Sequence, residues 1–403
     1  MNSKLDRRTV LAAAGALALG SGNLGREARA AAAPSIITVP IELRRQRIVT
    51  PLWIDRKGPF PFLLDTGSPY YAIDAEVALK AGLSATSSAW GMAGMTGDAR
   101  RVDAFLGTEV VIGGALRSEN VVFTASRLND GEAVGLVPRA LLMLRRTDLD
   151  PVGGEIRIYE TGAPDLKGYD RLHLVQAAEW VNGAVLGGTG ASTPDLVIDV
   201  VLDGAPLRLT VDTGAPSALT ITPWGVHRHG LWDKYPRWTT GDGRGLYEAY
   251  RGRMVRAGEL RVGSTVLKGP PVHLIDPNEA NLARATDGVI GLDTLRRFAM
   301  SIDFGQQALW IKPNATLDQP FRYNRSGIQL GQIDGRMGVA GVAAGSPAAA
   351  AGLQRGDVIL APSGQDGPAF QWSLYDAPGT VLEFAVRRDG AVKPVRLVLA
   401  ELL

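Results

Sequence analysis

One segment of this 403-residue chain occurs twice. Each copy reads as a strand, a tight turn, a second strand and then Asp-Thr-Gly, a small residue and Pro; the copies span residues 53–69 and 201–216. Each then reaches an apolar pair followed by Gly, at 133–136 and 289–292, and a Gly-centred turn before a last strand. A single Asp-Thr-Gly is an ordinary turn sequence. Two copies with matching flanks in the same order indicate a duplicated fold.

Short apolar runs separated by Gly, Pro, Asp and Asn fill most of the chain after residue 35. They are rich in β-branched and aromatic residues, which favour strands. The clearest runs are 110–114, 121–123, 155–159, 197–202, 207–211 and 308–311. Helical periodicity is confined to the short segments 74–81 and 292–298. The pattern predicts a mainly β, mostly antiparallel, bilobal body of two homologous halves, 36–170 and 171–318.

The sequence changes character near residue 323. The run 338–342 leads into Gly345-Ser346-Pro347-Ala348 and then into 351–359, and strand-like runs follow at 379–390 and 395–399. A segment of about 80 residues is long enough to fold independently. We expect a separate small α/β domain over 323–403.

Composition and charge exclude several classes of function. The chain has no cysteine, so thiolate metal sites, disulfide scaffolds and cysteine nucleophiles are absent. His227 and His229 have no obvious third ligand, and we expect no metal site. After residue 30 there are 38 basic and 39 acidic residues, which does not favour a nucleic-acid partner. The short basic pairs Arg145-Arg146 and Arg296-Arg297 are interpreted as solvated surface.

Residues 1–30 have the layout of an export signal peptide. Arg7-Arg8 precede an apolar run at 10–19, and Ala28-Arg29-Ala30 offers a cleavage site with small residues. The paired arginines resemble a twin-arginine signal, although that motif usually has Phe where Val10 stands. The apolar run is too short to span a bilayer. We expect a periplasmic or otherwise exported protein with no membrane span after signal removal; the alternative is a short N-terminal helix of a cytosolic protein.

The duplicated Asp-Thr-Gly with its downstream apolar-apolar-Gly resembles the aspartic proteases of the pepsin and retroviral type. The similarity covers about residues 36–315 and is closest to the bacterial branch that has two retroviral-like halves in one chain. The segment from 323 resembles a bacterial PDZ domain, through Gly345-Ser346-Pro347-Ala348 and Ala351-Gly352-Leu353 with the following Gly356-Asp357. The resemblance implies an acid-protease-like β body and a PDZ-like C-terminal domain.

Asp65 and Asp212 are the expected catalytic pair. In the aspartic-protease dyad, two carboxylates about 3 Å apart share one proton. The ionised partner takes a proton from a water molecule, and the protonated partner donates to the substrate carbonyl and later to the leaving amine. No covalent intermediate and no cofactor is implied. The proton belongs to the pair rather than to either residue.

Residues beside the two aspartates are expected to support their loops: Thr66, Gly67, Ser68, Thr213 and Gly214. The resemblance implies that the threonine hydroxyls cross-brace the loops. The glycines permit sharp turns and direct their N–H groups toward the carboxylates. Ser68 is expected to hydrogen-bond near Asp65, where the second copy has Ala215, so we expect the two carboxylates to be inequivalent.

Two Gly-rich segments, 91–97 and 241–245, are candidates for hairpins that cover the cleft. Pepsin-like enzymes have one flap that carries a tyrosine. Here the first segment has Trp90 and no tyrosine, whereas tyrosines lie just past the second. Whether one flap or two close over the substrate stays open. The candidate substrate-contacting residues are Trp90, Gly94, Gly243 and Tyr247.

The sequence therefore predicts an aspartic endopeptidase that acts on polypeptide substrates. The PDZ-like domain is expected to bind a C-terminal peptide by strand addition near 338–342; the alternative is a packing or dimerisation module. For the whole chain the alternative is a non-catalytic peptide-binding protein of the cell envelope with a protease-like cleft. A duplicated protease fold that no longer cleaves is a further alternative.

Overall fold

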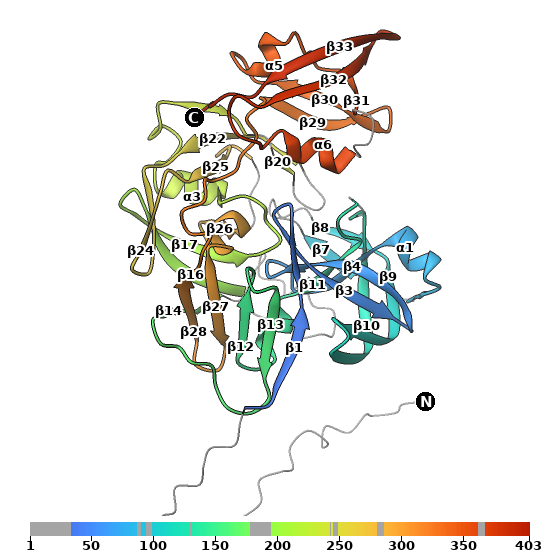
Figure 1. The fold of residues 1–403 in the computed structure, drawn as a ribbon, viewed down its shortest axis with the longest axis vertical. Coiled ribbons are helices and arrows are strands. Elements are labelled where there is room, and N and C mark those ends of the chain that lie inside the picture. Colours follow the sequence, from blue (N-terminus) through green and yellow to red (C-terminus); the bar gives the residue numbers. More distant parts are fainter. Residues whose placement is uncertain are drawn as a thin grey trace, which may run out of the picture. The chain divides into compact units, whose positions relative to one another are not determined.

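The structure is a computed structural model that describes residues 34–86, 90–93, 99–128, 131–177, 195–241, 243–244, 249–279, 286–361 and 367–403. The predicted signal peptide at 1–30 lies outside the described residues, as do Gly94 and Tyr247. The described chain is mainly β (Figure 1), as the sequence predicted.

The first half is built on an eight-stranded sheet that closes on itself, because β3 pairs with both β4 and β9. Its strand order is β2-β3-β4-β11-β5-β10-β9-β6. Two short helices and a separate hairpin, β7–β8, accompany it. The elements are β2 (Glu42–Arg44), β3 (Arg47–Ile54), β4 (Lys57–Asp65), β5 (Tyr71–Asp74), α1 (Ala75–Lys80), β6 (Ser84–Ala85), β7 (Trp90–Ala93), β8 (Ala99–Val102), β9 (Ala104–Ile112), β10 (Leu116–Ser126), β11 (Gly135–Pro138) and α2 (Ala140–Met143).

The second half repeats this plan with a ten-stranded sheet in which β17 lies between β16 and β26. The separate hairpin β20–β21 corresponds to β7–β8 of the first half. The elements are β15 (Val175–Ala177), β16 (Asp195–Leu202), β17 (Ala205–Asp212), β18 (Leu219–Ile221), α3 (Pro223–Arg228), β19 (Trp238–Thr240), β20 (Gly243–Arg244), β21 (Ala249–Tyr250), β22 (Gly252–Arg256), β23 (Glu259–Val262), β24 (Thr265–Lys268), β25 (Pro271–Ile275), β26 (Gly288–Gly291) and α4 (Leu292–Leu295).

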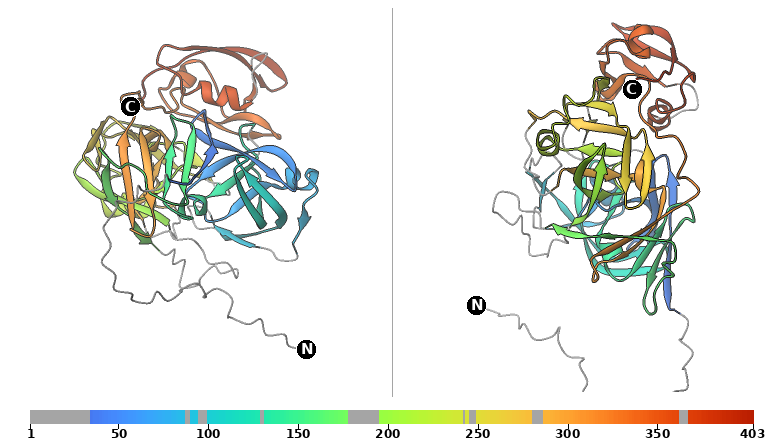
Figure 2. Two further views of the ribbon diagram at one scale, coloured as in Figure 1. Left: turned by 60° about the horizontal axis from the view of Figure 1, so that its bottom comes forward. Right: turned by 90° about the vertical axis from the view of Figure 1, so that its left-hand side faces the viewer.

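A six-stranded sheet joins the two halves (Figure 2). Its centre is the antiparallel pair of β12 and β27, and each of these strands also forms a hairpin with the next strand along the chain. Both hairpins were predicted from their Gly-centred turns. The strands, in sheet order, are β1 (Ile36–Pro40), β13 (Glu155–Tyr159), β12 (Thr147–Asp150), β27 (Phe298–Asp303), β28 (Ala308–Pro313) and β14 (Asp170–His173).

Most strand pairs are antiparallel, as predicted, but parallel pairs occur where the two Asp-Thr-Gly sequences lie. β4 pairs in parallel with β11, and Asp65 lies opposite Pro138. β17 pairs in parallel with β26, and Asp212 lies opposite Gly291. Both aspartates are therefore the last residues of strands that are paired on each side. Paired strands fix the direction in which the following loops leave the sheet.

The pairing corrects one detail of the predicted repeat. The sequence matched Gly135 to Gly291, because each follows an apolar pair. The structure matches Gly135 to Gly288 instead, since both begin the strands that pair with the Asp-Thr-Gly strands. The residue equivalent to Gly291 is Pro138. The register of the parallel ladder, rather than the local apolar pattern, sets this equivalence.

One helix in each half begins at a side-chain cap, α1 in the first half and α3 in the second. Asp74 accepts a hydrogen bond from the Val77 N–H at the start of α1, within the predicted segment 74–81. Thr222 accepts one from the Gly225 N–H at the start of α3, and Pro223 stands at its first turn. Such caps satisfy N–H groups that have no partner inside the helix. The segment 292–298 is helical only as far as Leu295, and Phe298 already begins β27.

Residues 323–403 contain a five-stranded sheet and two short helices with a hydrophobic core of their own. Ser346 caps the first helix by accepting from the Ala349 N–H. We call this part the C-terminal unit. Its elements are β29 (Ile328–Ile333), β30 (Arg336–Val342), α5 (Pro347–Ala350), β31 (Val358–Leu360), α6 (Gly367–Ser373), β32 (Val381–Arg388) and β33 (Ala391–Val398).

The structure contradicts the predicted binding edge at 338–342. These residues belong to β30, which pairs with β29 along its length and with β31 at Gly338. A strand paired on both sides has few free N–H and C=O groups for an added peptide. Among the described strands of this sheet, the edges are β29 and β33.

The prediction that Arg296-Arg297 is solvated is also wrong. The Arg296 and Arg297 side chains are 7% and 1% exposed, and the carboxylate of Asp293, fully buried in α4, lies 3.0 and 3.8 Å from them. Asp293 also accepts from the Gln46 side chain of the first half and from the backbone N–H of Arg322, the residue just before the C-terminal unit. A buried carboxylate is stable only with such partners.

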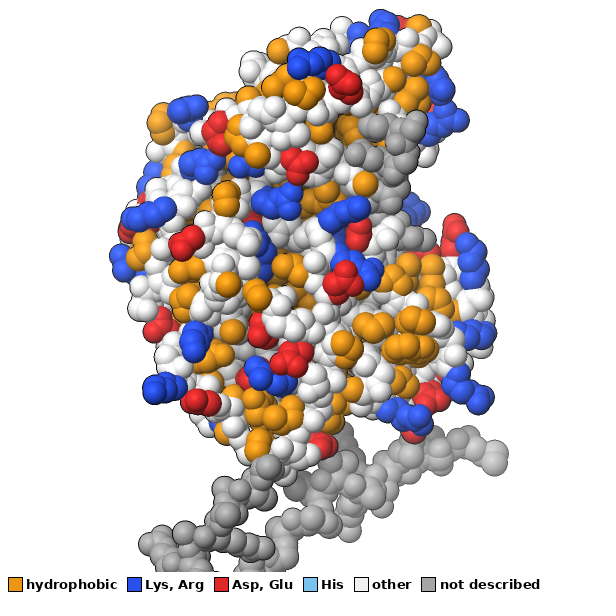
Figure 3. Space-filling model, viewed as in Figure 1, with side chains coloured by type: hydrophobic (Ala, Val, Ile, Leu, Met, Phe, Trp, Pro, Cys, Tyr) orange, Lys and Arg blue, Asp and Glu red, His pale blue; other side chains and the backbone are white. Residues whose placement is uncertain are grey.

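On the face drawn in Figure 3, basic and acidic side chains are interspersed over both halves. Among the described residues no helix is long and apolar enough to cross a membrane.

Candidate active site

The two Asp-Thr-Gly loops meet between the halves. Asp65 ends β4 and Asp212 ends β17, and their side-chain carboxyl groups lie within hydrogen-bonding distance of each other. Both side chains are surrounded by protein yet keep part of their surface exposed. A pair of carboxyl groups that is desolvated but open on one side can hold a proton and reach a ligand.

Thr66 and Thr213 connect the loops through four hydrogen bonds. The Thr66 hydroxyl donates to the Val211 carbonyl (2.6 Å) and accepts from the Thr213 N–H (2.9 Å). The Thr213 hydroxyl donates to the Leu64 carbonyl (2.6 Å) and accepts from the Thr66 N–H (3.1 Å). Both threonines are 1% exposed. The loops therefore hold each other by reciprocal contacts that solvent does not reach.

Gly67 and Gly214 allow the carboxyl groups to come close. A Cβ on Gly67 would lie 2.7 Å from Cγ of Asp212, and a Cβ on Gly214 would lie 2.5 Å from Cγ of Asp65. Real Cβ atoms essentially never approach other atoms so closely. Each glycine therefore makes room for the aspartate of the opposite half.

Backbone N–H groups surround the carboxylates in a similar way on both sides. The Ser68 N–H donates to Oδ1 of Asp65 (3.0 Å), and the Ala215 N–H donates to Oδ1 of Asp212 (3.1 Å). The Ser68 hydroxyl instead donates to the Tyr70 carbonyl (2.9 Å). The predicted bond from this hydroxyl to Asp65 is therefore not formed, and the Ser-for-Ala difference gives no reason for the carboxylates to be inequivalent.

The surroundings of the pair favour protonation. Burial, followed by the neighbouring Asp212 carboxylate, raises the pKa of Asp65. Burial also raises the pKa of Asp212, against the hydrogen bonds that its carboxylate accepts from backbone N–H groups. Desolvation disfavours the ionised form of each acid, and two adjacent negative charges repel each other. The pair therefore keeps a proton up to a higher pH than an exposed aspartate does.

The predicted flap segments both form hairpins, but the structure describes them only in part. β7, which contains Trp90, pairs with β8, and the positions of their side chains are not described. In the second half, β20 pairs with β21, with Gly243 opposite Tyr250. A Cβ on Gly243 would collide with the Tyr250 ring, which itself packs on His273. Trp90 and Gly243 therefore lie in the expected hairpins; Gly94 and Tyr247 lie outside the described residues.

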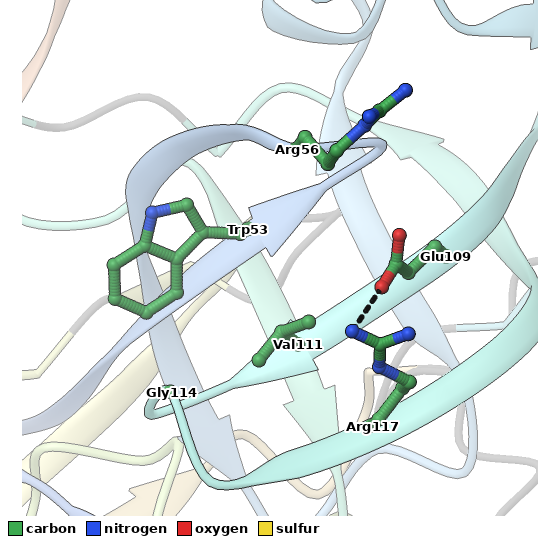
Figure 4. Close-up of a pocket in the computed structure, with 6 residues that line it drawn as sticks. All are labelled: Trp53, Arg56, Glu109, Val111, Gly114 and Arg117. Carbon is green, nitrogen blue, oxygen red and sulfur yellow. Dashed lines mark ion pairs between the residues drawn. The ribbon is translucent and has the colours of Figure 1, made fainter.

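A hollow of about 280 Å³ lies on the first half and is separate from the aspartate pair (Figure 4). It is lined by Trp53, Val111, Gly114, Arg56 and the ion-paired side chains Glu109 and Arg117 (2.8 Å). No residue of the predicted site lines it. It is not the candidate active site.

Sequence reasoning missed one residue that contacts a loop directly. Arg139 follows β11, and its guanidinium donates to the carbonyl of Gly67 (3.0 Å) while pairing with Asp195 (2.8 Å). The signal was present in the repeat. In the correct register, the first copy has Arg where the second copy has Leu292.

The arrangement can activate a water molecule without a metal or a covalent intermediate. The ionised carboxyl group of the pair can accept a proton from a water molecule bound at the exposed side. The protonated one can donate a hydrogen bond to a carbonyl oxygen as negative charge develops there. The first step needs an ionised carboxylate and the second needs a protonated carboxyl group. Because the raised pKa values keep one proton on the pair, both forms are present together.

One known protein family matches part of the second half. Residues 198–294 match a family model described as aspartyl protease. The matched segment runs from β16 to α4, so it contains the second Asp-Thr-Gly loop and the strand behind it. Among solved structures, the chain is similar to an aspartic proteinase from Irpex lacteus, with 11% identity, coverage of 71% of this chain and 99% of that chain, and a TM-score of 0.41. No curated protein matches the sequence. The family match supports a hydrolase of the aspartic-protease type.

Proposed function

We propose that the protein is an aspartic endopeptidase in which Asp65 and Asp212 together activate a water molecule. The observation that carries this proposal is the reciprocal contact of the two loops. The carboxyl groups are close enough to share a proton, and the glycine of each loop leaves room for the aspartate of the other. A turn with only a structural role has no need to bring two acids together in a desolvated place.

The reaction follows from the protonation of the pair. The ionised carboxylate removes a proton from water, and the water oxygen forms a bond to the carbonyl carbon of the peptide. The other carboxyl group donates its proton to the carbonyl oxygen, which gives a tetrahedral intermediate with two hydroxyl groups. As the C–N bond breaks, the leaving amine takes a proton from the pair and one of these hydroxyl groups returns a proton to the pair. The pair returns to its starting state, with one proton between the two residues.

We further propose that the C-terminal unit docks polypeptides. Its sequence resembles a PDZ domain, and such domains add a peptide as an extra strand at a sheet edge. With 338–342 excluded, β29 is the edge that fits this role, because no described strand pairs with its outer side. Removal of residues 323–403 is expected to change the choice of protein substrates while short peptides are still cleaved. Loss of short-peptide cleavage in a folded truncation would contradict a docking role.

The layout of residues 1–30 supports export, and we propose that the protein works outside the cytoplasm after signal removal. Fractionation of cells that produce the full chain tests this. Full-length protein in the cytoplasm, with residues 1–30 retained, would exclude the proposal.

The proposed activity is tested by incubating residues 34–403 with a mixed peptide library between pH 3 and pH 8. The library is also given to Asp65→Asn, Asp212→Asn and a control, Asp199→Asn, at an exposed aspartate on β16. We expect cleavage by the unmodified protein and the control, and none by the two loop variants. Peptide binding without cleavage by all four folded proteins would instead establish the non-catalytic peptide-binding protein.

A further inference from the structure

Arg139 lies directly behind the first Asp-Thr-Gly loop. Its backbone N–H donates to the Ser68 carbonyl (3.1 Å), and Nη1 of its side chain donates to the Gly67 carbonyl (3.0 Å). The side chain is 2% exposed. One residue thus holds two consecutive carbonyl groups of the loop that presents Asp65.

The other side of the guanidinium is anchored in the second half of the molecule. Nη2 of Arg139 lies 2.8 Å from Oδ1 of Asp195, whose side chain is 9% exposed. Asp195 is the first residue of β16, the strand that pairs with β17 and so supports Asp212. Burying both charges has a large desolvation cost, so such a pair is weak evidence of a stabilising role. The position of the Arg139–Asp195 ion pair between the two halves indicates a role other than stabilising the fold.

The second half shows that the loop fold does not require an arginine. Leu292 occupies the equivalent position after β26, and its backbone N–H donates to the Ala215 carbonyl (2.7 Å), as Arg139 does to Ser68. The Leu292 side chain is fully buried in the core and has no donor. The guanidinium is therefore an addition that only the first loop has.

We propose that Arg139 is a positioning residue, which fixes the peptide group between Gly67 and Ser68 so that the pair of aspartates keeps its geometry. The proposal rests on the proposed function, because it names a residue that serves the same site. The N–H of this peptide group belongs to Ser68 and donates to Oδ1 of Asp65 (3.0 Å), where it favours the ionised form of the carboxyl group. A planar guanidinium reaches Gly67 and Asp195 at once, whereas a lysine ammonium offers one point charge.

The proposal makes a directional prediction for the pH profile. When this peptide group is no longer fixed, the hydrogen bond from the Ser68 N–H to the Asp65 carboxylate weakens, and the pKa of Asp65 rises. The acid limb of the kcat profile reports formation of the ionised carboxylate, so this limb moves to higher pH. A residue that only stabilises the fold lowers the melting temperature and leaves the limb in place.

The experiment compares Arg139→Lys with Arg146→Lys. Arg146 is a matched control, because it also joins the two halves through an ion pair, with Asp303 (2.6 Å), but within the described part of the chain its side chain bonds to neither loop. We expect Arg139→Lys to lower kcat by about tenfold or more, with little change in KM, since small misplacement of reacting groups is costly. Its acid limb should move up by about half a pH unit or more. Arg146→Lys should keep the wild-type profile.

A second variant removes the charges together. In Arg139→Gln with Asp195→Asn, no buried charge is left without a partner, so the protein is expected to fold. The same shift of the acid limb is expected, with Arg146→Gln and Asp303→Asn as the matched control. An unshifted profile in the Arg139 variants, or an equal shift in the Arg146 variants, would overturn the positioning role.

A readout without turnover separates this proposal from the proposed function. The stability gained by Asp65→Asn, followed from pH 4 to pH 8, reports how strongly the pair holds its proton. If Arg139→Lys increases this gain, Arg139 positions the pair even if the protein cleaves no peptide. If the gain is the same with and without Arg139→Lys, the positioning role is wrong whatever the activity.

Discussion

In the first half, the residue behind the Asp-Thr-Gly loop is Arg139; in the second half it is Leu292. The loops themselves match in strand pairing, in threonine cross-bracing and in the contacts of their glycines. What differs is the support behind them. In the first half a buried guanidinium holds the Gly67 carbonyl of the loop, whereas the second half places its buried charge one residue later, at Asp293.

The buried charges of Arg139 and Asp293 connect different parts of the molecule. Arg139 contacts the loop and the second half, whereas Asp293 contacts Gln46 in the first half and the N–H of Arg322 at the start of the C-terminal unit. After duplication, the parts that touch the reacting groups stay alike, because both aspartates enter one pair. The supporting residues are free to diverge, because each half has different neighbours.

The largest expected effect is the loss of kcat when the loop glycines are replaced, and it tests whether the two loops are alike. Gly67→Ala and Gly214→Ala each place a Cβ against the opposite carboxyl group, so each should lower kcat by about a thousandfold or more. Gly305→Ala is the control, because its Cβ would find an ordinary contact at 3.4 Å. Steady-state cleavage of a peptide substrate measures all three. Substantial activity in one glycine variant alone would show that the loops do not meet symmetrically.

The next largest effect is on stability, and it tests whether the residues behind the two loops have different roles. Asp293→Asn leaves the buried guanidinium groups of Arg296 and Arg297 without their carboxylate, which should lower the free energy of unfolding by about 3 to 5 kcal/mol. Asp303→Asn, at a less buried pair with Arg146, should lower it by only about 1 kcal/mol. Urea unfolding gives both values. Equal losses of unfolding free energy would mean that Asp293 stabilises the protein no more than the less buried Asp303 does.

Removal of either threonine hydroxyl should weaken the contact between the loops by the same amount. Thr66→Val and Thr213→Val each leave a buried N–H and a buried carbonyl without a partner, at a cost of about 1 to 3 kcal/mol for each group. Thr66→Ser and Thr213→Ser keep the hydroxyl and should lose less. Thermal unfolding of the four variants tests this; a clear difference between the two valine variants would break the symmetry of the brace.

The last prediction concerns pH. Because the folded state raises the pKa of Asp65, ionisation of this group opposes folding above the ordinary aspartate value of about 4. Asp65→Asn should therefore leave stability nearly unchanged at pH 4 and increase it as pH rises toward 8, by about 1.4 kcal/mol for each unit of raised pKa. Melting temperatures across this range measure the gain. A gain that is largest at pH 4 would contradict the sign of the shift.

Much of the fold and of the candidate site could be predicted from the sequence, because local backbone needs produce visible patterns. Two Asp-Thr-Gly sequences at the ends of apolar strands predicted the two loops. The short helix within 74–81 and the hairpin turns were likewise predicted. Each of these features depends on residues only a few positions apart.

The features that sequence reasoning missed depend on distant partners. The burial of Arg296 and Arg297 follows from Asp293, which in turn contacts Gln46, 247 residues away. The pairing of Arg139 with Asp195 arises only when the two halves meet. The register of the repeat was wrong because glycines lie at both ends of β26, and only the ladder with β17 shows which one corresponds to Gly135.

The most direct test of the central claim compares Asp65→Asn, Asp212→Asn and the double variant in one peptide-cleavage assay. Groups that act as a unit lose their effect together, so removal of the second one adds little. We predict that each single variant is as inactive as the double variant, with all three folded as judged by circular dichroism. Losses that multiply in the double variant, or one single variant that retains cleavage, would show that the two loops do not form one catalytic pair.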